Sequence, residues 1–144
     1  MGKKKVIEKT AGVESAKPSE APSQAKSSKK ISQGRIYINA SYNNTMITVT
    51  DAKGGVVAWA SAGSLGFSGP KKATPFASSK VIAAIMEKVD KTGPNEVDLY
   101  ISGVGAGRDS AIRTLANYPL TIHSLHDITP IPHNGPRPPK ARRV

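Results

Sequence analysis

Basic side chains alternate with prolines along residues 129–144, which read TPIPHNGPRPPKARRV. Five prolines exclude a helix and hold the backbone extended, and no carboxylate follows Asp127. A stiff arm with charge of one sign loses little conformational entropy when it lies along a polyanion. The alternative is a solvated tail without a partner. The residues of this arm that we expect to contact a nucleic acid are His133, Asn134, Gly135, Arg137, Lys140, Arg142 and Arg143.

A second candidate for phosphate binding is the glycine-rich stretch SAGSLGFSGPKKATPF, residues 61–76. It leads into a predicted helix with Thr74 as N-cap and Pro75 at the first helical position. A phosphate there would meet free backbone N–H groups, the positive end of the helix dipole and two lysines. An ordinary glycine-rich connection without a ligand is the alternative. The candidate residues are Gly66, Phe67, Ser68, Gly69, Lys71, Lys72 and Thr74.

The sequence GVGAGR at residues 103–108 is a third glycine-rich stretch. It fails the dinucleotide-binding fingerprint, because the third glycine would fall at Arg108, and it lacks the Lys-Ser/Thr pair of a P-loop. We therefore expect no cofactor. Gly105, Gly107 and Arg108 are expected to bind a phosphate of a nucleic-acid backbone rather than that of a nucleotide cofactor. The remaining candidates for nucleic-acid contact are the turn residues Asn43, Asn44 and Lys53 and the helix residue Arg113.

The cysteine, aspartate and histidine content of the chain gives little support for a catalytic or metal site. The chain has no cysteine, which excludes disulfides, thiolate metal sites and thiol catalysis. Asp98, Asp109 and Asp127 are scattered, so a two-metal nuclease is a poor alternative. His123 and His126, three residues apart, are expected on opposite faces of a strand and make a poor metal pair.

Charge divides the 144-residue chain into three parts with a formal net charge of +11. Residues 1–33 form a lysine-rich, low-complexity segment that we expect to be a disordered basic tail. Residues 34–128 are expected to form one nearly neutral domain, and residues 129–144 the extended basic arm. There is no long apolar run and no signal-peptide pattern, so we expect no membrane association and a cytoplasmic location.

The elements that must position these residues are predicted by hydrophobic periodicity. Strands are expected at residues 35–40, 45–50, 56–61, 96–102 and 120–128, and helices after Thr74 and after Arg108. The first three strands should form an antiparallel meander, and the last two, joined through a helix, should be parallel. The fold class is therefore α/β, with the order βββ-α-β-α-β, which resembles the ribonuclease H-like mixed sheet.

Four stretches resemble a known family in their order and spacing: SYNNTMITVTD, SAGSLGFSGPKKATPFA, GVGAGRDSAIR and DITPIPHNGPRPPKARRV. They are similar to the bacterial form of small ribosomal subunit protein eleven, from about residue 34 to the end. Pro136 and Ala141 depart from the family pattern, and Ala141 interrupts the basic run.

The resemblance implies a structural RNA-binding protein without catalytic activity on the platform of the small subunit. It implies binding to 16S-type rRNA, bridging of RNA helices and a part in the Shine–Dalgarno cleft that holds mRNA. The implied protein partners are small-subunit proteins seven and eighteen and initiation factor three.

Overall fold

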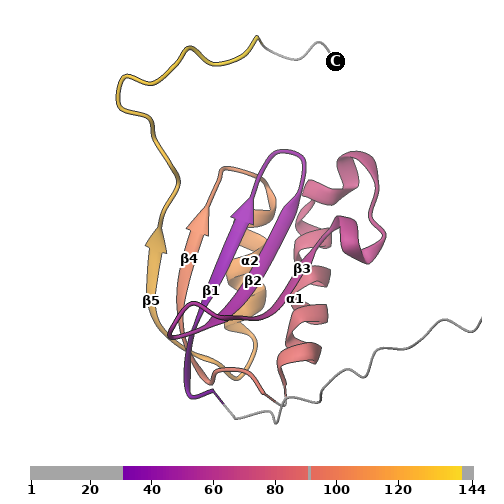
Figure 1. The fold of residues 1–144 in the computed structure, drawn as a ribbon. Helices are drawn as coiled ribbons and strands as arrows, with labels where there is room; N and C mark the ends of the chain where they lie inside the picture. The colour runs from indigo at the N-terminus through magenta and orange to yellow at the C-terminus, as the bar shows by residue number, and fades with distance from the viewer. Residues whose placement is uncertain (1–30, 91, 141–144) are drawn as a thin grey trace, which may run out of the picture.

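The computed structural model describes residues 31–140 except residue 91. A five-stranded mixed sheet carries two helices, which lie behind it in Figure 1. The elements are β1 (Gln33–Ala40), β2 (Thr45–Asp51), β3 (Val56–Ser61), η1 (Gly63–Leu65), η2 (Gly69–Ala73), α1 (Pro75–Val89), β4 (Glu96–Ser102), α2 (Gly107–Ala116) and β5 (Thr121–Asp127). The expected basic tail lies almost wholly outside the described residues, as do Ala141, Arg142 and Arg143 of the arm.

The sheet has the strand order β3-β2-β1-β4-β5. Strand β2 is antiparallel to both β1 and β3, which confirms the predicted meander. Strand β4 is parallel to β5, as the helical connection between them requires, and it is also parallel to β1. The C-terminal ends of β1, β4 and β5 therefore lie at the same end of the sheet.

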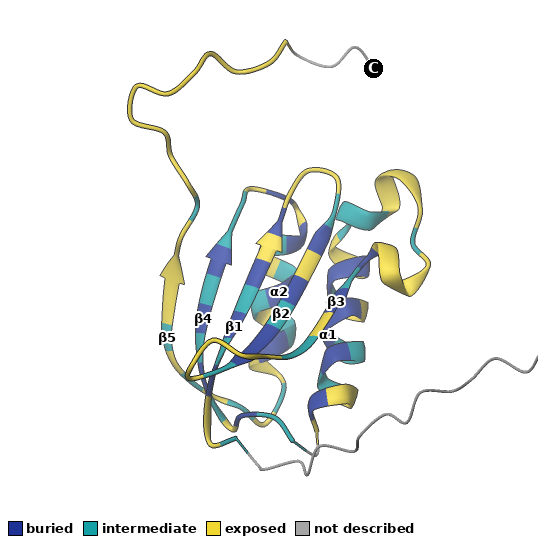
Figure 2. Ribbon diagram, viewed as in Figure 1, coloured by how far each residue is buried: buried dark blue, intermediate teal, exposed yellow. Residues whose placement is uncertain are grey.

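The core lies between the sheet and the two helices, where Figure 2 shows the buried residues. The alternation predicted for β1 is confirmed: Ile36 and Ile38 are buried against the helices, and Arg35 and Tyr37 face the other way. Helix α1 buries Val81, Ile82 and Ile85 at the expected spacing. Among the described residues, no helix covers the opposite face of the sheet.

Helix α1 begins as the sequence predicts. The Thr74 hydroxyl accepts a hydrogen bond from the Ala77 N–H at 3.3 Å, and Pro75 is the first helical residue. The helix ends at Val89, where the N–H groups of Asp90 and Gly93 reach carbonyls of the last turn. The stretch before it, residues 61–74, contains the short helices η1 and η2.

The prediction that His123 and His126 occupy opposite faces of a strand is wrong. The pairing of β4 with β5 shifts by one residue between Val97 and Asp98, so an extra residue of β5 sits opposite this step. His123 then reaches Glu96, and His126 stacks on Tyr100, on the same open side of the sheet. Alternation assumes a regular strand, and a bulge moves every later side chain to the other face.

Candidate nucleic-acid interface

Three connections and the exit of the arm gather at one end of the domain, which we call the loop end. It comprises the turn 41–44, residues 62–74, the loop 103–106 and the arm from residue 129 (Figure 1). The connections are tied by backbone hydrogen bonds: Gly105 N–H donates to Ala40 O at 2.8 Å, and Ala62 N–H donates to Thr45 O at 2.9 Å. Most candidates from the sequence are therefore brought together by the topology.

Not every candidate lies there. The turn 52–55, which carries Lys53, joins β2 to β3 at the opposite end of the sheet. Arg113 is exposed in the last turn of α2, away from the helix start. Arg142 and Arg143 lie outside the described residues.

Gly105 of the loop 103–106 and Gly107 at the start of α2 pack closely against other parts of the chain. A Cβ added to Gly105 would lie 2.3 Å from Ser41 O, and one added to Gly107 would lie 2.6 Å from Thr45 Oγ1. Both glycines are buried. Close packing of Gly105 against Ala40 and Ser41, and of Gly107 against Thr45 and Ser78, therefore explains these two glycines without a ligand. Their contact with RNA stays a prediction.

Arg108 fixes the start of the arm. Its guanidinium donates to Asp127 Oδ2 at 2.6 Å and to Gly103 O at 3.0 Å, and Thr129 Oγ1 lies 3.4 Å away. The Asp127 carboxylate also accepts from the N–H and hydroxyl of Thr129. The Arg108 guanidinium, with these two Thr129 bonds, holds the pKa of Asp127 well below its usual range. The last strand, the helix start and the first arm residue thus form one polar cluster.

Beyond this cluster, residues 130–140 contain no helix or strand and leave the body of the domain (Figure 1). The chain bends at His133 and Asn134, and Asn134 has a positive φ of 56°. Arg137 and Lys140 are exposed, and neither forms an ion pair with any described carboxylate. Their charges are available to an anionic partner.

The stretch 63–74 presents cations and aromatic rings beside the start of α1. Lys71 is exposed at the end of η2, whereas the Thr74 hydroxyl is engaged in the helix cap and in a bond to Lys71 O. Phe67 packs partly against the core and meets Phe76 edge-on at 6.1 Å between ring centroids. Phe76 is 63 % exposed, and Lys80 Nζ lies 5.6 Å from its ring centroid.

Two exposed aromatic residues, one at the loop end and one in the first turn of α1, were not among the residues selected from the sequence. Tyr42 is 79 % exposed in the turn 41–44, next to Asn43. Phe76 lines a shallow hollow on the exposed side of α1, together with Lys80 and Glu87. An aromatic side chain within a polar turn, or outside the buried face of a helix, was the available signal, because such a ring has no core position to fill.

Comparison with known proteins identifies the class to which these features belong. Residues 34–143 match the family described as Ribosomal protein S11. The chain is 50 % identical over 119 residues to the small ribosomal subunit protein uS11 of Treponema pallidum strain Nichols, covering 83 % of this chain and 94 % of that protein. It is 50 % identical over 122 residues to that of Borreliella burgdorferi strain ZS7, covering 85 % and 94 %. The uS11 protein of Rippkaea orientalis is 46 % identical over 129 residues, covering 90 % and 99 %.

The chain therefore belongs to the ribosomal protein S11 family, as the resemblance of the four stretches indicated. This is a family of structural proteins, not of enzymes. Within the described residues, no helix has the length and apolarity needed to cross a membrane. The described part of the chain contains no group of three or more Asp, Glu, His or Cys side chains that could hold a metal ion.

Proposed function

We propose that this protein is a structural constituent of the small ribosomal subunit and binds 16S-type rRNA on the platform. The observation that carries this proposal is the loop end, where a basic arm and a lysine-bearing stretch leave the same end of a family S11 domain. Neutralising phosphates where RNA helices converge would bridge those helices. We infer that the protein's five-stranded mixed sheet is a ribonuclease H-like scaffold that serves binding here.

The finer parts of the proposal follow from family membership. The loop end would help to form the cleft that holds the Shine–Dalgarno duplex and mRNA. Small-subunit proteins seven and eighteen and initiation factor three would be the neighbouring proteins. The protein would act in the cytoplasm as part of the ribosome.

Crosslinking of assembled small subunits tests this proposal. The chain is incorporated into subunits, irradiated, and the peptides that carry RNA adducts are identified by mass spectrometry. We expect adducts at Tyr42, Phe76 and the segment 129–140, because these lie at the loop end or, for Phe76, in the first turn of α1 directly after it. Absence of the chain from purified subunits, or adducts confined to α2 and to α1 beyond Lys80, would reject it.

A nuclease control separates the binding role from catalysis. Purified protein is incubated with RNA and Mg²⁺ or Mn²⁺, and the RNA is examined for cleavage. We expect intact RNA, because Asp127 is committed to Arg108 and Asp98 accepts from the Ser124 hydroxyl. Cleavage that is lost on Asp98→Asn or Asp127→Asn would instead support a metal-dependent nuclease.

A further inference from the structure

The face of the sheet opposite the helices carries a line of side chains in register across every strand. Within the described residues no helix or strand covers this face, which points toward the viewer in Figures 1 and 2. The paired residues along the line are His126, Tyr100, Tyr37, Thr48 and Trp59. We call this line, with Met46, Glu96 and Asp98 beside it, the open face.

The rings along this line stack on one another. Tyr37 and Tyr100 have centroids 5.1 Å apart with planes 20° from parallel, and Tyr100 and His126 are 5.0 Å apart at 22°. Nearly parallel rings at this spacing cannot lie flat side by side, so their faces contact each other and their edges point outward. A nucleic-acid base could stack only at the two ends of such a row. In the described chain, no residue hydrogen-bonds to the phenol oxygen of Tyr37 or Tyr100.

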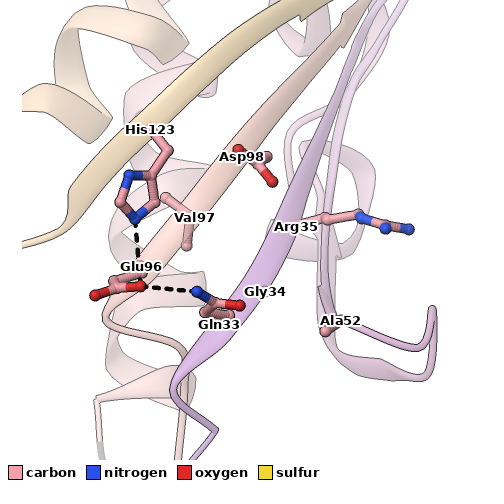
Figure 3. A pocket seen from close by; sticks show the side chains of 8 residues that line it. All are labelled: Gln33, Gly34, Arg35, Ala52, Glu96, Val97, Asp98 and His123. Atoms are coloured by element: carbon pink, nitrogen blue, oxygen red, sulfur yellow. Dashed lines mark hydrogen bonds and ion pairs between the residues drawn. The ribbon is translucent and has the colours of Figure 1, made fainter.

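Carboxylates lie next to the row. Glu96 and Asp98 point to the same face as Tyr100 on β4, and they border a hollow of about 360 Å³ (Figure 3). Glu96 accepts hydrogen bonds from Gln33 and His123, and neither carboxylate forms an ion pair with a described lysine or arginine. Arg35 of β1 lines the same hollow and pairs in register with Asp98, and Figure 3 shows its side chain extending away from both carboxylates. Because the Arg35 guanidinium is directed away, the two carboxylates make the part of the hollow beside β4 suited to a cation, in a chain of net charge +11.

The other half of the open face is apolar. Trp59 is 56 % exposed and Met46 is 40 % exposed, on β3 and β2. Tryptophan, tyrosine and methionine are enriched at protein–protein contacts, and arginine is the charged residue type that is enriched with them. An aromatic row between a carboxylate pair and an apolar edge therefore has the composition of a protein-binding surface.

We propose that the open face docks an extended, arginine-bearing segment of another protein. A guanidinium lies between Glu96 and Asp98, where it also reaches the Tyr100 hydroxyl, and an apolar side chain of the same segment covers Trp59. Arginine matches this site because its planar group pairs with carboxylates by two parallel hydrogen bonds. The proposal goes beyond RNA binding, which uses the loop end and the arm.

Trp59 is the single tryptophan of the chain, so its fluorescence reports directly on this face. The full-length protein in solution is titrated, at physiological salt, with a blocked seven-residue peptide in which three arginines alternate with valines. We expect a saturable change in Trp59 emission, and no such change with a peptide in which glutamines replace the arginines. A basic peptide is repelled by the net charge, so binding must arise from local contacts.

Paired variants locate the binding. The double substitution Glu96→Gln with Asp98→Asn should weaken peptide binding by at least about fivefold. Glu87→Gln with Asp90→Asn, which changes the net charge equally at exposed positions in and just after α1, should leave it unchanged. Equal losses in the two double variants, or no saturable signal with the arginine peptide, would overturn the proposal.

A single-stranded RNA of about twelve nucleotides distinguishes the other class of partner. We expect it to bind without altering Trp59 emission and without displacing the peptide. RNA that both changes the emission and competes with the peptide would make the open face an RNA surface and refute protein docking. Because the assay uses free protein, its result is separate from incorporation into small subunits.

Discussion

Gly105 shows how one missing side chain shapes the loop end. A Cβ at this position would lie 2.3 Å from Ser41 O and 2.9 Å from Ala40 O, and backbone atoms cannot move aside cheaply. We expect Gly105→Ala to lower the free energy of unfolding by about 1–3 kcal/mol. Urea unfolding followed by circular dichroism measures this change.

Gly63→Ala is the matched control, because its added Cβ would first meet Lys72 Cδ at 3.7 Å. Its effect should stay within about 0.5 kcal/mol. If both alanine variants unfold at the same urea concentration as the wild type, the loop 103–106 does not pack on the turn 41–44 as described.

Asp127 should make part of the stability depend on pH. Its pKa in the folded state is lowered from 3.8, so the stabilisation is present above that value and is lost as pH falls toward the folded-state pKa. Asp127→Asn should therefore lower the melting temperature at neutral pH, and its difference from the wild type should shrink below about pH 3.8. Thermal melts at several pH values test this.

The control for this pH dependence is Glu87→Gln, an exposed carboxylate in α1 that has no ion-pair partner among the described residues. It should melt close to the wild type throughout the range. A difference for Asp127→Asn that persists unchanged at about pH 2.5 would show that loss of the charge is not what matters.

At the scale of elements, Arg108 joins α2, β5 and the arm. An anchor needs a guanidinium that reaches Asp127 and Gly103 O together, whereas a phosphate contact needs only positive charge. We expect Arg108→Lys to reduce incorporation into small subunits nearly as much as Arg108→Ala, because lysine cannot hold both partners. Rescue by lysine would show that Arg108 serves chiefly as a contact to RNA.

The arm itself should be the main anchor to RNA. Deletion of residues 133–144 removes no helix or strand that the structure describes, so the domain should remain folded by circular dichroism. It should reduce incorporation sharply, and more than deletion of residues 1–30. Net charge alone predicts the opposite order, since residues 1–30 carry +5 and residues 133–144 carry +4. A larger loss on removing residues 1–30 would contradict the role given to the arm.

For the whole molecule, the separation of charge from the folded core predicts steep salt dependence. If the arm and the loop end neutralise about six phosphates, the logarithm of the RNA-binding constant should fall with the logarithm of salt concentration at a slope of about −4 to −5. Filter binding or fluorescence anisotropy over a range of salt measures the slope. A slope shallower than about −2 would mean that most of these charges remain solvated in the complex.

Periodicity and local chemistry within the sequence were enough to determine the elements and much of their packing. The Thr74–Pro75 helix start, the alternation of β1 and the parallel pairing of β4 with β5 all depend on neighbouring residues and on chain connectivity. The basic, proline-rich composition of residues 129–144 is also read directly from the sequence, and the role of this segment as an RNA-binding arm stays a prediction. Family membership also followed from residues alone.

Only the tertiary structure decided which residues share a surface. The bulge in β5 places His123 and His126 on one face of the sheet. The fold brings Arg108 next to Asp127, where the two form an ion pair. The strand register aligns Trp59 with Tyr37 and Tyr100. Each depends on pairing between segments distant in sequence, where a shift of one residue reverses a side chain's direction. Local sequence patterns contain no information on that register, so the open face could not be foreseen from them.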